Sequence, residues 1–152
     1  MSRSSEPSTL SWTAPEAAHP ARDASRRMID TVMRDAKDEW LDLFSADAVL
    51  EDPVGRSHFD PEGGGHRGRD ALFGFWDRAI DLAERFDFDI RDSFACGSEC
   101  VNVGTITTSL PGGAKMDVEA VFCIGVDDTG HITSYRVFWE SDRAMATLRQ
   151  SE

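Results

Sequence analysis

Residues 48–55 read AVLEDPVG, which places the carboxylate of Asp52 at the end of an apolar strand and directly before a proline. A proline disfavours helical backbone at the residue before it, so Asp52 is predicted to be extended and held on a fixed backbone. Strand alternation puts Asp52 on the face of Leu50 and Glu51 on the opposite face. If the Leu50 face lines an apolar pocket, burial raises the proton affinity of Asp52 and makes it a plausible general base near neutral pH. An isolated Glu-Asp pair at a strand end is more often solvated, so this interpretation depends on the rest of the chain.

Length and composition indicate one globular domain. The chain has 152 residues, of which 40% are hydrophobic, and carries a formal net charge of −12. Such an acidic chain is a poor nucleic-acid partner, because phosphate binding needs a basic face. Three cysteines, without a secretory signal, argue against a disulfide framework and favour the cytoplasm. No apolar run is long enough to span a bilayer, so membrane insertion is not expected.

Helical patterns come first along the chain and strand patterns follow. Apolar residues recur every three to four positions over 20–36 and 69–85, and a shorter helix begins at Asp38. Strands are predicted, besides 48–52, at 86–95, 100–110, 115–126 and 132–140. This order indicates an α+β fold whose helices cover one face of a curved antiparallel sheet. The predicted domain spans residues 19–142, between a mobile N-terminal tail at 1–18 and a C-terminal tail at 143–152.

The loop at 53–68 is rich in glycine and contains a literal G-x-G-x-x-G at 63–68. A dinucleotide site is not favoured, since ten residues separate this motif from its strand and the later strands look hairpin-linked. His58 and His66 are more often solvated in such a loop, and no Cys or acid lies at a convincing metal spacing. We therefore expect neither a metal nor a cofactor.

Three motifs resemble the ketosteroid isomerase-like family, within the SnoaL-like and NTF2-like superfamily. They are WLDLFSADAVLEDPVG at 40–55, GRDALFGFW at 68–76 and DTGHITSYRVFW at 128–139. The resemblance implies an NTF2-like cone around an apolar pocket, usually in a homodimer, with a steroid- or polyketide-like ligand. It also matches Asp52 to the general base that moves a proton between two carbons of a β,γ-unsaturated 3-ketosteroid.

The chain departs from that family at the groups that hydrogen-bond the substrate oxygen. The resemblance places Met28 where the family has a tyrosine donor and Phe122 where it has a protonated acid, and Trp76 replaces a supporting tyrosine. Losing such donors slows chemistry unless other groups replace them. Tyr135, the only tyrosine, shares a strand face with Trp139, which the resemblance places on the pocket wall.

Tyr135 is therefore a candidate donor, although an ordinary core tyrosine is the simpler interpretation. Asn102 is a second candidate, and Gly104 on the same face is expected to enlarge the cavity. The predicted catalytic residues are Asp52 and Tyr135, and the predicted substrate-binding residues are Met28, Phe44, Trp76, Asn102, Gly104, Phe122 and Trp139.

Three functions fit these expectations. The first is an isomerase-like enzyme in which Asp52 removes a proton α to a carbonyl. The second is another reaction in the same pocket, such as cyclisation, dehydration or epoxide opening. The third is a non-catalytic protein that binds a steroid or polyketide, with Asp52 as a hydrogen-bonding partner. A pure scaffold role is the least favoured.

Overall fold

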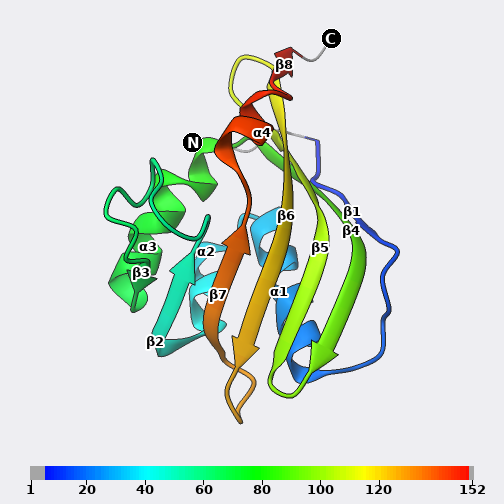
Figure 1. Ribbon diagram of the computed structural model, residues 1–152, viewed down its shortest axis with the longest axis vertical. Coiled ribbons are helices and arrows are strands. Elements are labelled where there is room, and N and C mark those ends of the chain that lie inside the picture. The colour runs from blue at the N-terminus through cyan, green and yellow to red at the C-terminus, as the bar shows by residue number, and fades with distance from the viewer. Residues whose placement is uncertain (1–5, 151–152) are drawn as a thin grey trace.

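A strongly curved, open sheet forms the body of the protein in this computed structural model, which describes residues 6–150 (Figure 1). Its strands are β1 (Leu10–Trp12), β2 (Phe44–Glu51), β3 (His66–Arg67), β4 (Arg85–Cys96), β5 (Glu99–Ser109), β6 (Ala114–Val126), β7 (Ile132–Phe138) and β8 (Arg149–Gln150). The order across the sheet is β1-β4-β5-β6-β7-β2-β3, and β8 pairs with β6. Only β1 with β4 and β2 with β7 pair in parallel within the described residues. The predicted α+β fold with a mostly antiparallel, curved sheet is confirmed.

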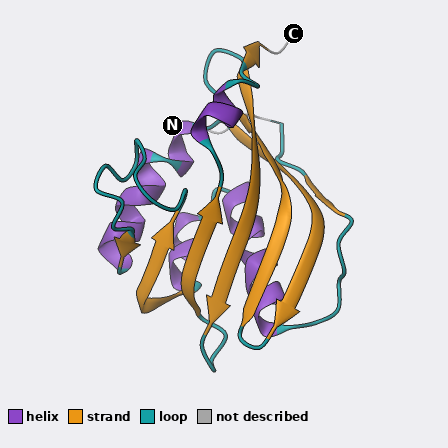
Figure 2. Ribbon diagram, in the orientation of Figure 1, coloured by secondary structure: helices purple, strands orange, loops and turns teal. Residues whose placement is uncertain are grey.

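Three helices cover one face of this sheet (Figure 2). They are α1 (Pro20–Met33), α2 (Lys37–Asp42) and α3 (Arg69–Arg78); a 3-10 turn, η1 (Ile80–Leu82), follows α3, and α4 (Ser141–Met145) lies near the C-terminus. Helix α1 packs against β4, β5 and β6. Since the apolar stripe of α1 faces the sheet, the space between helix and sheet holds the core and, as described below, a cavity.

The first helix is shorter than its apolar periodicity predicts. It begins after His19, whose ring Nδ1 accepts a hydrogen bond from the Ala21 N–H at 3.1 Å, and it ends at Met33. Asp35 adopts a left-handed φ of 57°, and the Ala36 N–H donates to the carbonyl of Thr31 at 2.9 Å. These contacts end α1. Ala36 is therefore the N-cap residue of α2 and not part of α1.

A bulge in β4 bends the sheet at the middle of the cone. The pairing of β4 with β5 shifts register between Ile90 and Asp92, which leaves Arg91 as an extra residue. Opposite the bulge stands Gly104, and a Cβ atom built there would lie 2.2 Å from the backbone oxygen of Asp89. Gly104 was predicted to enlarge the cavity. Its observed role is to let two backbones approach closely where the sheet bends.

Gly104→Ala is therefore expected to destabilise the fold by about 1–3 kcal/mol or more, the cost typical of overpacking. The overlap is with backbone, which cannot move aside as a flexible side chain can. Chemical unfolding of the variant and the parent protein measures this difference. The matched control is Gly64→Ala, because a Cβ at Gly64 meets nothing within 4 Å and its φ is not left-handed. Equal stability of Gly104→Ala and the parent protein would contradict the close approach.

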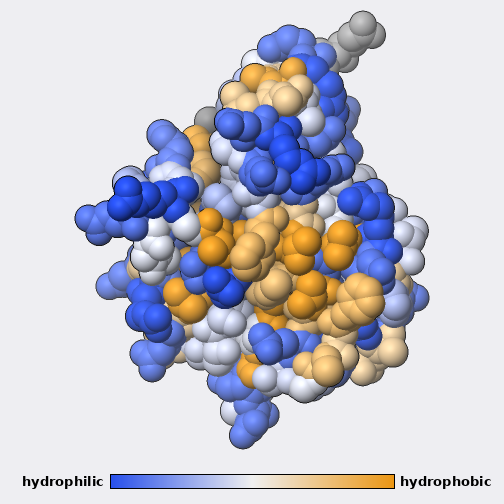
Figure 3. Space-filling model, viewed as in Figure 1, coloured by the Kyte–Doolittle hydropathy of each residue, from blue (hydrophilic) through white to orange (hydrophobic). Residues whose placement is uncertain are grey.

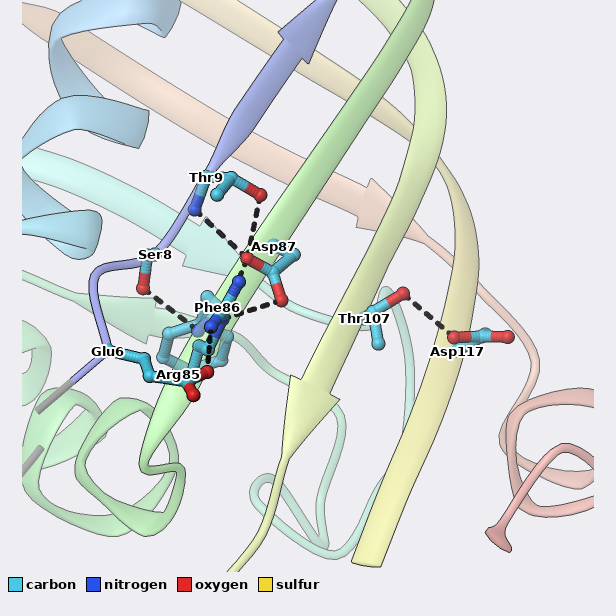
Figure 4. Close-up of polar contacts among 8 residues, drawn as sticks. All are labelled: Glu6, Ser8, Thr9, Arg85, Phe86, Asp87, Thr107 and Asp117. Carbon is cyan, nitrogen blue, oxygen red and sulfur yellow. Dashed lines mark hydrogen bonds and ion pairs between the residues drawn. The ribbon is translucent and has the colours of Figure 1, made fainter. Parts of the chain in front are cut away.

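Part of the segment predicted to be a mobile tail belongs to the sheet. Strand β1 pairs with β4, and the residues before it are tied to the start of β4 (Figure 4). Thr9 donates to Asp87 Oδ1 from its N–H at 2.9 Å and from its hydroxyl at 2.8 Å, and the Phe86 N–H donates to Ser8 Oγ at 3.1 Å. Sequence periodicity missed this strand because it is three residues long and pairs across a long sequence separation. Residues 1–5 of the predicted tail lie outside the described residues.

The predicted C-terminal tail is also partly ordered. Helix α4 and strand β8 follow β7, and the Asp117 N–H of β6 donates to Thr147 Oγ1 at 2.7 Å. Arg149 of β8 forms an ion pair with the Asp117 carboxylate at 3.2 Å. These contacts dock the segment on the end of β6; residues 151–152 lie outside the described part. Among residues 6–150, no helix combines the length and apolarity needed to cross a membrane.

Candidate active site

Asp52 follows the last residue of β2 and faces the helices. Because β2 runs parallel to β7 with Leu50 opposite Tyr135, the side chain of Asp52 lies between those of Tyr135 and Trp139 along the same face. The indole N–H of Trp139 donates to Asp52 Oδ1 at 2.7 Å. Glu51 points to the other face, where its Oε1 accepts from Arg136 Nε at 3.0 Å. The two neighbouring acids thus face in opposite directions, as the strand pattern predicts.

Three adjoining apolar pockets, named here the inner, middle and outer chambers, lie between helices and sheet. The inner chamber, of about 10 Å³, is lined by Ser25, Met28, Ile29, Phe88, Ile90, Asn102, Phe122, Ile124 and Tyr135. The middle chamber, of about 70 Å³, is lined by Met28, Ile29, Val32, Trp40, Leu50, Asp52, Phe75, Ile80, Phe86, Phe88, Ile106 and Tyr135. The outer chamber, of about 160 Å³, is lined by Asp52, Phe59, Phe75, Ala79, Ile80, Leu82, Ala83, Phe86, Ile106, Thr108, Leu110, Met116, Val118 and Trp139. Neighbouring chambers share lining side chains, and the exposed Leu82 marks the solvent side.

Asp52 is the one carboxylate in the walls of these three chambers. Burial raises its pKa from 3.8 to about 6, and the hydrogen bond from Trp139 lowers the pKa in partial opposition. A carboxylate with a pKa near 6 is mostly ionised at neutral pH yet basic enough to accept a proton from carbon.

Asp52→Asn is expected to stabilise the fold at neutral pH. Since the pKa of Asp52 is higher in the folded than in the unfolded chain, the folded state holds the proton more tightly, and stability is lost as pH rises from about 4 through about 6. At one pKa unit per about 1.4 kcal/mol, removing the charge should add about 1–3 kcal/mol at pH 7. Urea unfolding of both proteins at pH about 5 and about 8 measures this. The raised pKa would be contradicted if the free energy of unfolding of the parent protein did not fall, relative to that of Asp52→Asn, between the two pH values.

Tyr135 lines both the inner and the middle chamber. Its side chain is 7% exposed, and its hydroxyl has no hydrogen-bond partner within residues 6–150. Burial raises the phenol pKa well above 10, and the nearby charge of Asp52 raises the pKa further. A neutral phenol in an apolar cavity can donate a hydrogen bond to an oxygen on a bound molecule.

The structure brings most of the predicted site residues to the cavity. Met28 lines the inner and middle chambers, Asn102 and Phe122 line the inner chamber, and Trp139 lines the outer one. The apolar Met28 and Phe122 stand in the chamber walls themselves, so neither offers a hydrogen bond there.

Three predicted substrate-binding residues lie elsewhere. Phe44 and Trp76 line none of the three chambers, because both pack on the buried Trp40, with ring centroids 4.8 Å and 5.2 Å from it. Gly104 lines a hollow of about 410 Å³ on the opposite, outer face of the sheet. Periodicity identifies these residues as apolar and inward, but the packing of α2 and α3 decides which inward residues reach the cavity.

Sequence reasoning missed part of the cavity wall. Phe86 and Phe88 alternate with charged residues along β4, so their inward direction was visible, yet nothing in the sequence set them apart from ordinary core. Ser25 was missed outright. A serine within a helical apolar stripe gives no signal of its own, and its position becomes meaningful only beside Asn102, which donates to Ser25 Oγ at 3.1 Å.

Hydrogen bonds within the glycine-rich loop fix its conformation. The N–H groups of Gly63 and Gly65 donate to the carboxylate of Asp60 at 3.1 Å and 2.8 Å. His66 was predicted to be solvated but is 8% exposed, with its ring 5.0 Å from that of Phe75, and burial lowers its pKa. Pairing of the short β3 with Leu50 brings His66 under α3.

Comparison with known proteins identifies a family and similar folds. A family model described as a SnoaL-like domain matches residues 25–135, whereas no curated protein matches by sequence. RV0760c from Mycobacterium tuberculosis, solved in complex with estradiol-17beta-hemisuccinate, is 28% identical with a TM-score of 0.77, covering 87% of this chain and 99% of that one. The Δ5-3-ketosteroid isomerase from Mycobacterium sp. is 29% identical with a TM-score of 0.77, covering 88% and 100%. A computationally designed 17-OHP binder is 26% identical with a TM-score of 0.78, covering 89% and 99%.

The family match covers most of the chain, and both natural neighbours share its cone of helices on a curved sheet. The protein therefore belongs to the SnoaL-like domain family, within the ketosteroid isomerase-like group of NTF2-like proteins.

Proposed function

We propose that this protein is an enzyme that moves a proton between two carbons of a steroid- or polyketide-like ketone, with Asp52 as the general base. The observation that carries the proposal is a single carboxylate, with its pKa raised to about 6, in the wall of an apolar cavity. The similar chain from Mycobacterium sp. is a Δ5-3-ketosteroid isomerase, which supports this reaction class.

The proposed reaction uses Asp52 twice. Its carboxylate removes a proton from the carbon between the carbonyl and the double bond, and electrons move onto the carbonyl oxygen to form a dienolate. Asp52 then returns the proton to the γ carbon, which leaves the conjugated enone. Because the Trp139 N–H holds Oδ1, Oδ2 is the oxygen that carries the proton. Tyr135 donates a hydrogen bond to the substrate oxygen as negative charge develops there.

Incubation of the protein with a β,γ-unsaturated 3-ketosteroid tests this proposal. The conjugated enone absorbs ultraviolet light strongly, so its formation is followed directly. Enone formation above the rate in buffer is the expected result. Steroid binding without any enone would contradict the proposed reaction.

A binding protein without catalysis is the second candidate. It is favoured by Met28 and Phe122, whose apolar side chains occupy the positions where the resemblance places donors to the substrate oxygen. The neighbour solved with estradiol-17beta-hemisuccinate and the designed 17-OHP binder share this fold. Cyclisation, dehydration or epoxide opening remain alternatives within the superfamily, and analysis of products from candidate polyketides separates them from isomerisation.

A homodimer is also proposed, through the outer face of the sheet. Figure 3 shows apolar side chains gathered over the central strands on this face. Phe94, Val121 and Phe138 are 61%, 36% and 43% exposed. A second copy of the chain is the partner that the family resemblance implies. Sedimentation should give twice the mass of one chain, and Val121→Glu should give a single-chain mass.

A further inference from the structure

A closed ring of hydrogen bonds lies behind the inner chamber. It joins Arg22 and Ser25 of α1, Ser93 of β4, and Cys100 and Asn102 of β5. All five side chains are at most 6% exposed. Helix α1 and strands β4 and β5 therefore contact one another through polar side chains. The core around these side chains is apolar.

The direction of every hydrogen bond in this ring is fixed from both ends. Arg22 can only donate, and its Nε donates to Ser93 Oγ at 2.9 Å, which leaves the Ser93 proton for Cys100 Sγ at 3.4 Å. Cys100 donates to Asn102 Oδ1 at 3.3 Å, and Asn102 Nδ2 donates to Ser25 Oγ at 3.1 Å. The Ser25 hydroxyl donates to the carbonyl of Arg22 at 2.8 Å, and a carbonyl can only accept. The amide of Asn102 is thus locked in one orientation.

This orientation leaves one N–H of Asn102 without a partner. An asparagine amide has two N–H donors, and within residues 6–150 only one of them is used, toward Ser25. The side chain is 2% exposed and lines the inner chamber. A buried donor without an acceptor is costly, so such groups are usually satisfied by a partner, an ordered water or a ligand.

Two unpaired donors share the inner chamber, because the Tyr135 hydroxyl also lines it and also has no partner among the described residues. The chamber volume of about 10 Å³ is near the minimum needed to hold one water-sized atom. Asp52 lies in the next chamber outward. An oxygen in the inner chamber would therefore place the adjoining carbons of its molecule on the side of the base.

We infer that the inner chamber receives the carbonyl oxygen of the ligand, and that the locked amide of Asn102 donates to this oxygen together with the hydroxyl of Tyr135. The inference rests on the proposed function for its ligand class and deepens it: the ligand enters oxygen first and needs a ketone at its leading end. Asn102 and Tyr135 replace the donors that Met28 and Phe122 do not supply.

A pair of ligands that differ in one oxygen tests this inference. The affinities of a 3-ketosteroid and its 3-deoxy counterpart are measured by calorimetry for the parent protein and for Asn102→Leu, which keeps the size of the side chain and removes its polar atoms. The parent protein should prefer the ketone by about 10-fold or more. Asn102→Leu should lose most of that preference, with little change in affinity for the deoxy compound.

Thr31→Val is the matched control, because Thr31 is a buried polar residue of α1 whose hydroxyl donates to the carbonyl of Met28, outside the ring, and it lines none of the three chambers. It should lower stability and keep most of the preference for the ketone. Equal loss of both ligands in Asn102→Leu would mean that Asn102 only supports the fold and would overturn the inference. If Asn102→Leu does not fold, the affinities of the parent protein still test the inference. Equal affinity of the parent protein for the ketone and the deoxy compound would overturn the inference.

Failure of the proposed reaction is distinguishable from failure of this inference. A protein that prefers the ketone through Asn102 but forms no enone contradicts the isomerase proposal and keeps the oxygen-first orientation. A protein that forms enone but shows no dependence of ketone binding on Asn102 contradicts the inference alone. Binding of neither steroid contradicts both.

Discussion

Asp52→Asn is expected to slow enone formation from a β,γ-unsaturated 3-ketosteroid by about 10²- to 10⁴-fold, the usual contribution of a positioned general base. The amide has nearly the same shape and can still accept the hydrogen bond that Trp139 Nε1 donates at 2.7 Å. The cavity is therefore expected to keep its form while the proton acceptor is lost. Steady-state assays of enone absorbance, with binding of the same steroid measured in parallel, separate the loss of chemistry from the loss of binding.

The matched control for this variant is Glu51→Gln. Glu51 precedes Asp52 in the chain but faces the other side of the sheet, where it pairs with Arg136 at 3.0 Å. Neutralising it removes one acid from the same stretch without entering the cavity. Turnover should stay within about 2-fold, since surface ion pairs contribute little. Comparable losses in both variants would contradict a specific role for Asp52.

Tyr135→Phe is expected to lower kcat by about 10²- to 10³-fold, the cost of removing one donor to a developing oxyanion. The hydroxyl has no partner among residues 6–150, so its removal breaks no hydrogen bond in the unliganded protein. Stability should accordingly change little, because no hydrogen bond within residues 6–150 is lost. The measurement is kcat and KM for the ketosteroid alongside a chemical unfolding curve.

The opposite pattern would identify an ordinary core tyrosine. In that case Tyr135→Phe leaves kcat unchanged and alters stability alone. Because Tyr135 is the only tyrosine of the chain, no second phenol can substitute for it and mask the effect.

Much of the fold is readable in the sequence because local patterns encode it. Alternation along β4 and β5 and the turn at Asp127–Gly130 predict hairpins close to those observed. What local patterns do not encode are pairings across long sequence separations. Strand β1 pairs with β4, the preceding Thr9 bonds to Asp87, 78 residues away, and β8 docks on β6. Both segments therefore looked like tails.

The candidate site likewise has features that local sequence patterns predict and features that depend on contacts between distant segments. The direction of Asp52 follows from strand alternation before a proline, which is local information. Its bond to Trp139 depends on the parallel register of β2 and β7, and the lock on Asn102 depends on α1, β4 and β5 meeting. Phe44 and Trp76 show the converse, since apolar character predicts burial but not which of two neighbouring apolar regions a side chain joins.

The pH dependence of turnover tests the central claim most directly, namely that Asp52 acts as a base inside an apolar cavity. A base works when deprotonated, and burial raises the pKa of Asp52 to about 6. The value of kcat/KM for the ketosteroid should therefore rise with pH and level off above an apparent pKa near 6. A profile that is flat through this range, or that levels off near pH 4 as for a solvated carboxylate, would contradict the claim.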